Sequence, residues 1–396
     1  MNVLFLTTSY PSFIQTKRDF AINIHNLARE LGNKCDSITV LAPHDNDTSN
    51  FKIVDNVEIH RFQYWFTKNT QKVAYNSGIY DNLKYSILAK LQFPFFIISF
   101  LIKSIILSKD KDVIHAHWSL PGLLAVFVKK IVGIPVYLTF RGTGLTNSPR
   151  WLLKFICNNV DLVNVDDFVR KEMVESLGTS VKLSDVKLKY LDSNRYNSKI
   201  SGHRIQKEFN LKNKKVITNA GRIVPVKDIH IYIKAAYILT KKTNYNFKFL
   251  IVGDGVLLPA LKQLSKKLNI YDNIIFMGDR KDINEIYAAS DAVVITESNQ
   301  ICFSNIILES MAIGTPCIIP KMRDSVEYWS DRENCIFYEP KNSFDLSNSI
   351  QLLFDDQKLY EKIRLNSLDW NEVQGFTKSE VVDRTLKFYD KLVLRR

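Results

Sequence analysis

Several features that would place this 396-residue chain in a narrow class are scarce in its sequence. Its five cysteines are odd in number and form neither a CxxC pair nor a zinc-type spacing with histidine. They are Cys35, Cys157, Cys302, Cys317 and Cys335. We therefore expect no disulfide framework and no metal site, and the cysteine pattern favours a reducing, cytoplasmic compartment.

The start of the sequence lacks the form of a secretion signal. The opening MNVLFLTTSY has no basic segment before its apolar run, and the run ends after about five residues. We therefore expect no signal peptide and predict a first β-strand here.

One strongly apolar stretch, residues 91–107, is shorter than the roughly 20 residues of a membrane-spanning helix and contains Pro94 and Lys103. We expect that it does not cross a bilayer. It is either a buried helix of the first domain or an interfacial helix with lysines nearby. In the second interpretation, the side chains that face lipid are Phe93, Phe95, Phe96, Phe100 and Leu101.

No glycine-rich loop follows the first predicted strand, where the sequence reads FIQTKRDF. A dinucleotide-dependent dehydrogenase would carry GxGxxG there, and the later pair Gly253 and Gly255 is followed by Leu258 in place of a third glycine. A metal-dependent transferase would use a DxD pair. That spacing occurs at residues 45–47 and 110–112, in polar loops that we interpret as solvated. Neither class is favoured.

The chain is rich in positive charge, with 54 Lys and Arg against 41 Asp and Glu and a formal net charge of +13. Such a charge balance favours an anionic partner. Three kinds of partner fit: a nucleic acid, an acidic membrane surface or a phosphate-bearing substrate. The cations are spread along the chain without a recognised nucleic-acid motif, so no nucleic-acid partner is expected.

Short apolar runs alternate with helix-period stretches along the chain, which predicts βαβ units, parallel sheets and an α/β fold. The length exceeds that of a single core, so we expect two domains. The pattern restarts after Tyr196, and the polar segment 192–203 is the predicted linker. The ten predicted strands are residues 3–7, 37–41, 113–117, 136–140, 161–165, 216–220, 247–252, 273–277, 292–296 and 316–320.

Two stretches of the second half suit a sugar-nucleotide donor. Gly221 and Arg222 follow a strand and Lys227 precedes a helix, so both cations are placed to neutralise a diphosphate, unless they are ordinary surface cations. Glu309, one turn into a later helix, can accept hydrogen bonds from the cis-diol of a ribose. The amides at the start of that helix favour an anion, and they belong to Phe303, Ser304, Asn305 and Ile306.

Five motifs, in this order and spacing, resemble a known family. They are LFLTTSYPS at 4–12, HAHWSLPG at 115–122, LIVGDG at 250–255, FMGDRKDINEIYAASDAVV at 276–294 and SNIILESMAIGTPCI at 304–318. They are similar to the retaining glycosyltransferases of family 4, which have the GT-B fold. The resemblance implies two Rossmann-like, doubly wound parallel-sheet domains facing a cleft, and transfer without a metal or cofactor from a nucleotide diphosphate sugar.

The resemblance also implies domain bounds and residue roles. Residues 1–196 would form the acceptor-side domain, 197–376 the donor-binding domain, and 377–396 a helix that packs back on the first. Gly221, Arg222 and Lys227 would hold the diphosphate, and Glu309 the ribose. The segment with Asp279 and Arg280 would lie beside the nucleobase. His117 would orient the reacting sugar, although a histidine at a strand end is also often a core residue.

The sequence departs from the family pattern where the sugar is handled. The family has a glutamate eight residues before the position of Glu309, but this chain has Ile301, and its nearest carboxylate is Glu297. Arg141 stands in place of a histidine. We expect His117, Arg141 and Glu297 to be the catalytic residues, and a cationic Arg141 would suit a charged sugar or a phosphorylated acceptor.

The resulting interpretation is a hexosyltransferase that acts on a glycan or lipid-linked acceptor in bacterial surface polysaccharide synthesis. It would be cytoplasmic, with peripheral contact to an anionic membrane surface. The alternative is a non-catalytic nucleotide-sugar-binding subunit of a glycosyltransferase complex, which the departures at Ile301 and Arg141 would also explain.

Overall fold

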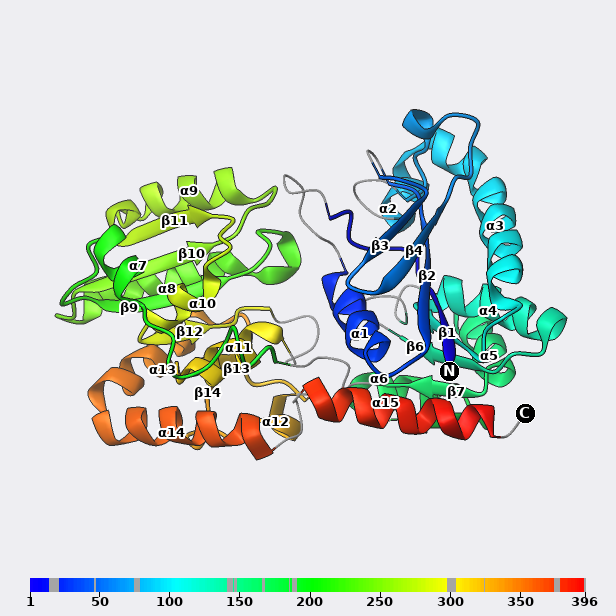
Figure 1. Ribbon diagram of the computed structural model, residues 1–396. Helices are drawn as coiled ribbons and strands as arrows, with labels where there is room; N and C mark the ends of the chain where they lie inside the picture. The colour runs from blue at the N-terminus through cyan, green and yellow to red at the C-terminus, as the bar shows by residue number, and fades with distance from the viewer. Residues whose placement is uncertain are drawn as a thin grey trace. The chain divides into compact units, whose positions relative to one another are not determined.

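The structure is a computed structural model, and it divides the chain into two units, each with its own sheet (Figure 1). Unit 1 comprises Met1–Lys189 and Lys378–Arg396, and unit 2 comprises Tyr190–Thr377. The division therefore falls before the predicted linker rather than after Tyr196. The residues described are 1–396 except 14–20, 46–47, 75–78, 141–144, 146–147, 166–167, 185, 187–190, 298–303, 324, 374–377 and 395–396.

The sheet of unit 1 has eight strands in the order β3-β4-β2-β1-β5-β6-β7-β8, and only the β3–β4 pair is antiparallel. The strands are β1 Asn2–Leu6, β2 Ser37–Pro43, β3 Phe51–Val54, β4 Val57–Phe62, β5 Val113–His117, β6 Val136–Thr139, β7 Leu162–Asn164 and β8 Lys182–Ser184. The five strands predicted for this half are present. The β3–β4 hairpin and β8 were not predicted.

Helices cover both faces of this sheet, and Figure 1 shows α3 and α4 on one side of it and α1 on the other. They are α1 Ile22–Gly32, α2 Ile79–Tyr85, α3 Ile87–Ser108, α4 Ser119–Val132, α5 Arg150–Asn159, α6 Phe168–Glu175 and α15 Lys378–Val393. The final helix, α15, packs against α1 and β5 within unit 1. Successive side chains of a strand point to opposite faces. In β5, Ile114 and Ala116 accordingly join the core on the α3–α4 side, while His115 contacts α15.

Helix α3 is longer than predicted, with 22 residues, because Ser86 caps its first turn and Pro94 does not end it. Among the described residues it is the one helix long and apolar enough to cross a membrane. The prediction that this apolar segment is too short to span a membrane was therefore wrong about the length of the helix. It was also wrong about two lipid-facing side chains, since Phe96 and Phe100 are fully buried against Phe62 in the core of unit 1.

The sheet of unit 2 has six parallel strands in the order β11-β10-β9-β12-β13-β14. They are β9 Lys215–Ala220, β10 Phe247–Val252, β11 Ile274–Gly278, β12 Ala292–Val294, β13 Cys317–Pro320 and β14 Ile336–Tyr338. The five strands predicted for this half are all present, and β14 was missed. Both sheets have the predicted parallel α/β architecture.

Two apolar layers enclose the sheet of unit 2. One contains α8 and α13 with Phe247 and Phe249, and the other contains α11 with Val293 and Trp329. The helices are α7 His203–Glu208, α8 Ile229–Lys242, α9 Leu258–Lys267, α10 Ile283–Ala288, α11 Asn305–Ile313, α12 Ser325–Tyr328, α13 Ser343–Asp355 and α14 Gln357–Val373. Tyr196 is buried in the α11 layer, which explains why the division of the chain precedes it.

Candidate functional site

Four neighbouring strands of unit 2 end at one edge of its sheet, because they are parallel. Gly221 follows β9, Gly253 follows β10, Asp279 follows β11 and Glu297 lies three residues after β12. Ligands of open parallel α/β sheets bind outside this carboxyl edge. The fold therefore gathers most of the donor-binding residues predicted from the sequence on one edge.

Glycine lets two of these loops touch. A Cβ on Gly253 would lie 1.9 Å from the Gly221 carbonyl oxygen, and a Cβ on Gly255 would lie 2.3 Å from that of Ile223. The Gly221 amide donates to the Val252 carbonyl at 2.9 Å, and the Ile223 amide to that of Asp254, also at 2.9 Å. This backbone contact fixes the turn that carries the exposed Arg222 side chain at the sheet edge.

Lys227 ends a short 3₁₀-helix, Pro225–Lys227, and its ammonium forms an ion pair with the Glu297 carboxylate. The Thr296 hydroxyl donates to the Lys227 carbonyl at 2.6 Å, which holds the two loops together. A Cβ on Gly221 would lie 4.0 Å from Lys227 Cε and 3.8 Å from Ile306 Cδ1. The structure therefore brings the predicted diphosphate-binding cation, the predicted catalytic carboxylate and the start of α11 together.

The start of α11 is the predicted anion-binding helix terminus. Ser304 is the residue before its first turn, and its side chain makes no capping hydrogen bond within the described part of the chain. Asn305 and Ile306 open the helix, so their amides belong to the first turn, which has no intrahelical acceptors. Phe303 and Ile301 lie outside the described residues.

Glu309 lies one turn into α11 and interacts with the Tyr196 side chain. Burial raises the pKa of its carboxyl to about 7, and Arg195 and Tyr196 act in the opposite direction. Arg195 is itself held by a 2.6 Å hydrogen bond to the Lys281 carbonyl. Sequence reasoning missed both residues because they lie in the predicted linker, although Tyr196 is its one aromatic residue.

Asp279 is exposed after β11, and Arg280 is held in an ion-pair network. The Arg280 guanidinium donates to Glu208 at 2.8 and 3.0 Å and to Asp282 at 2.9 and 2.8 Å. Donation from Arg280 lowers the pKa of the Asp282 carboxyl to about 2. The structure thus gives Arg280 a structural task between α7 and α10, and its place beside a nucleobase stays a prediction.

The predicted catalytic histidine belongs to unit 1. His117 ends β5, is fully buried, and has its ring centroid 5.0 Å from Phe5 and 4.2 Å from His115. His115 is held by Tyr389 of α15 at 2.6 Å and by Thr139 at 2.7 Å. These are the surroundings of a core histidine, and a role of His117 over the sugar stays a prediction. Arg141 lies outside the described residues.

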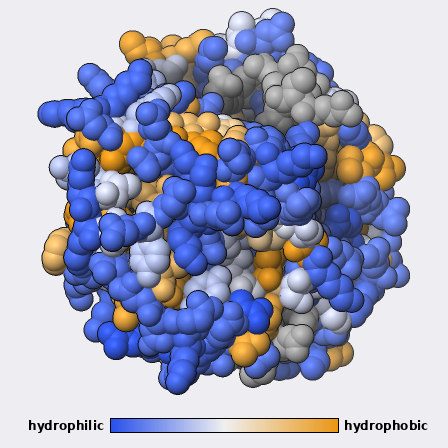
Figure 2. All heavy atoms as spheres, turned by 90° about the vertical axis from the view of Figure 1, so that its left-hand side faces the viewer, coloured by the Kyte–Doolittle hydropathy of each residue, from blue (hydrophilic) through white to orange (hydrophobic). Residues whose placement is uncertain are grey.

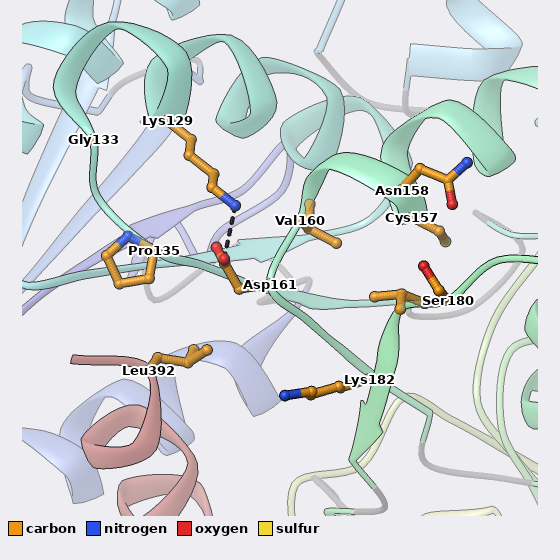
Figure 3. Close-up of a pocket in the computed structure, with 11 residues that line it drawn as sticks. Lys129, Gly133, Pro135, Cys157, Asn158, Val160, Asp161, Ser180, Lys182 and Leu392 are labelled. Carbon is orange, nitrogen blue, oxygen red and sulfur yellow. Dashed lines mark hydrogen bonds and ion pairs between the residues drawn. The ribbon is translucent and has the colours of Figure 1, made fainter. Parts of the chain in front are cut away.

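A cavity of about 410 Å³ in unit 1 lies away from His117 (Figure 3). It is lined by the starts of β6, β7 and β8, so it is at the opposite edge of the sheet from His117. Lys129 forms an ion pair with Asp161 at 2.7 Å there, and Leu392 reaches it from α15. The cavity therefore has no part in the predicted chemistry.

Metal-binding groups are missing from the described part of the chain, where no three His, Cys, Asp or Glu side chains lie close enough to hold an ion. In the DxD pair at residues 110–112, Asp110 forms an ion pair with Lys111, and Asp112 accepts a hydrogen bond from the Asn2 amide at 2.7 Å. Both are structural contacts. In the DxD pair at residues 45–47, Asn46 and Asp47 are outside the described residues.

Comparison with known proteins decides the family. Residues 203–370, inside unit 2, match the family described as "Glycosyl transferases group 1". This part of the chain is a glycosyltransferase domain of that family. The match covers the whole carboxyl edge described above, from Gly221 to Glu309, and thus the candidate nucleotide-sugar site.

Relatives of this glycosyltransferase are distant. It is 25% identical over 259 residues to the N-acetyl-alpha-D-glucosaminyl L-malate synthase of Bacillus anthracis, covering 63% of this chain and 67% of that protein. It is 26% identical over 317 residues to the UDP-Gal:alpha-D-GlcNAc-diphosphoundecaprenol alpha-1,3-galactosyltransferase of Escherichia coli, covering 74% and 78%. The crystal structure of Anabaena HepE in complex with UDP superposes with a TM-score of 0.78 at 17% identity, over 99% and 100% of the two chains, which confirms the GT-B fold.

The raised pKa of Glu309 predicts that donor affinity depends on pH. If the ribose hydroxyls need the carboxylate form, binding of an intact nucleotide sugar should be about tenfold weaker at pH 6 than at its plateau above pH 7. Folding stability should change in the opposite sense: because the folded pKa is raised, the stabilisation from this group is lost as the pH rises to about 7.

Calorimetric titration and thermal denaturation between pH 5.5 and 8.5 check both trends. Glu309→Gln is the matched variant, because it keeps the shape of the side chain and cannot titrate. It should remove both pH dependences, and an equal dependence in Glu309→Gln and the parent protein would show that another group titrates.

Proposed function

We propose that this glycosyltransferase moves a hexosyl group from a nucleotide diphosphate sugar to a glycan or lipid-linked acceptor, with retention at the anomeric carbon and without a bound metal. The observation that carries the proposal is the convergence of Gly221, Lys227 and the start of α11 at the carboxyl edge of unit 2. Glu309 stands one turn further along the same helix.

Sugar transfer from a nucleotide diphosphate requires positive charge near the diphosphate, at that edge of the sheet. When the bond from the anomeric carbon to the diphosphate breaks, its electron pair leaves with the nucleoside diphosphate, so negative charge develops on the phosphate oxygens. Preorganised cations and helix-terminal amides stabilise such charge. Lys227, Arg222 and the first turn of α11 are described groups of unit 2 that can do so without a metal ion.

The Lys227–Glu297 pair bears on how the donor is accommodated. A diphosphate that bonds to Lys227 brings a second anion beside Glu297, and like charges repel at this range. The Glu297 carboxylate would then turn from Lys227 toward the sugar end of the donor. In this proposal Glu297 serves where the family has the glutamate that Ile301 replaces.

The acceptor is the finer part of the proposal. The name of the Escherichia coli relative includes a diphosphoundecaprenol-linked sugar, and that of the Bacillus anthracis relative includes malate. We infer a lipid-linked acceptor, used at the cytoplasmic face of a membrane during surface polysaccharide synthesis. The net charge of +13 suits both a diphosphate-bearing lipid and an anionic membrane surface.

The experiment that tests the proposal is a panel of nucleotide sugars scored twice, by thermal shift for binding and by released nucleoside diphosphate for turnover. Each donor is offered with a polyprenyl-diphosphate sugar and, separately, with malate. We expect one donor to stabilise the protein and to turn over only with the lipid-linked acceptor. Arg222→Ala should weaken binding, whereas Lys362→Ala, which removes an exposed cation of α14, should not.

Two other outcomes would change the conclusion. Binding that requires Arg222, without turnover on any acceptor, would favour a non-catalytic nucleotide-sugar-binding subunit. Turnover with malate alone would retain the transferase and contradict the lipid-linked acceptor.

A further inference from the structure

One face of α3 is apolar and exposed along its whole length. Its six members are spaced three or four residues apart, which places them on one side of a helix, and each is between 49% and 77% exposed: Ile87, Leu91, Phe95, Ile98, Ile102 and Ile106. The chain advances by 19 positions from Ile87 to Ile106, so these residues form a stripe about 28 Å long at 1.5 Å per residue. We call these six residues the α3 stripe.

The opposite face of α3 is fixed to unit 1. The Phe100 ring stacks on Phe62 with centroids 4.6 Å apart, and the Phe96 ring meets Phe62 edge-on at 5.2 Å. Gln92, fully buried, donates to the Thr70 carbonyl at 2.8 Å and accepts from the Lys72 amide at 2.8 Å. These contacts hold α3 along the sheet of unit 1 (Figure 1). Its apolar side chains are therefore divided between a buried, protein-facing side and an exposed side.

Two nearby helices of unit 1 also expose apolar side chains. Helix α3 packs against α4, and α4 packs against α5. Both have exposed apolar side chains, which are Phe127 and Ile131 on α4 and Trp151 on α5. Hydrophobic side chains on the face drawn in Figure 2 instead lie in small separate groups among hydrophilic ones, which is normal for a soluble surface.

The charge of these three helices has one sign. Together α3, α4 and α5 contain no Asp or Glu, and their charged residues are Lys90, Lys103, Lys129, Lys130, Arg150 and Lys154. Lys129 is occupied by Asp161, and Lys130 lies 5.7 Å from the Phe155 ring centroid. Apolar helices that contain cations and no acidic residue complement an anionic lipid surface, into which apolar side chains insert while lysines meet the headgroups.

We propose that the α3 stripe, with Phe127, Ile131 and Trp151, is the surface by which this protein lies on an anionic membrane. The helix lies in the interface and does not cross the bilayer, because its buried face is part of the core of unit 1. This inference rests on unit 1 alone. It stands or falls separately from the transferase proposal, since vesicle binding needs neither donor nor turnover.

The test is sedimentation of the full chain with vesicles of phosphatidylcholine alone or with about one third phosphatidylglycerol. We expect binding to the anionic vesicles, weaker binding to the neutral ones, and loss of binding as salt is raised. The double variant Ile98→Asp with Ile102→Asp should bind at least about tenfold more weakly. Leu365→Asp on α14 is the matched control, because Leu365 is as exposed as Ile102, at 51%, and lies in unit 2; it should bind normally.

Unfolding is separated from lost docking by the thermal denaturation curve, which should be unchanged in the double variant because both isoleucines are exposed. Absence of vesicle binding by the parent protein, or equal loss with Leu365→Asp, would overturn the proposal. So would a dimer in sedimentation velocity that the double variant dissociates without any vesicle binding, because the stripe would then belong to a contact between two copies.

Discussion

Glu309→Ala is expected to weaken binding of the nucleotide sugar by about 100-fold or more. In the proposed complex, the two ribose hydroxyls donate to the Glu309 carboxylate. Hydrogen bonds to a charged group contribute about 1.5–3 kcal/mol each, and each 1.4 kcal/mol is a factor of ten in affinity. Since the loss falls on binding of the nucleoside part, it should appear with the nucleoside diphosphate as well as with the nucleotide sugar.

Calorimetric titration of the variant measures the effect, and Glu361→Ala is its control. Glu361 is a partly exposed carboxylate of α14 whose partner, Arg364, lies 2.8 Å away on the same helix. Its loss should leave donor affinity unchanged, because surface ion pairs contribute little. If Glu309→Ala binds the donor as tightly as Glu361→Ala does, Glu309 does not bind the ribose.

Gly253→Ala is expected to abolish measurable donor binding and to destabilise unit 2 by about 3 kcal/mol. The added Cβ would lie 1.9 Å from the Gly221 carbonyl oxygen, a backbone atom that cannot rotate away. The loops after β9 and β10 must therefore separate, which moves Gly221 and Arg222 from the sheet edge. Gly253 also has a φ of +128°, a conformation that disfavours alanine.

Gly278→Ala separates the clash from the backbone strain. Gly278 also has a positive φ, +67°, but a Cβ there would meet nothing within 4 Å. The Gly278→Ala protein should lose only about 1–2 kcal/mol of stability and should still bind the donor. Thermal denaturation and donor titration of the two variants give the comparison. Equal losses in both would show that strain, rather than the contact between the two loops, sets the requirement for glycine.

Part of the candidate site follows from the sequence because it depends on where strands end. All ten predicted strands are present, and parallel strands collect their carboxyl ends at one edge. The placement of Arg222, Lys227 and Glu309 near that edge therefore needed only the periodicity of the chain. The β3–β4 hairpin was missed because β3 is an exposed edge strand without a buried face, although its turn at Asp55 and Asn56, with φ of 50° and 62°, has hairpin chemistry.

Contacts between distant residues were decided by the tertiary structure alone. Lys227 and Glu297 pair across 70 positions, and Tyr196 interacts with Glu309 from a segment that its polarity marked as a linker. Likewise, hydropathy identified α3 as apolar but could not say which of its phenylalanines face the core. Local patterns encode the period and ends of an element, whereas partners and facing depend on how elements pack, and here packing buries Phe96 and Phe100 and leaves Ile98 and Ile102 exposed.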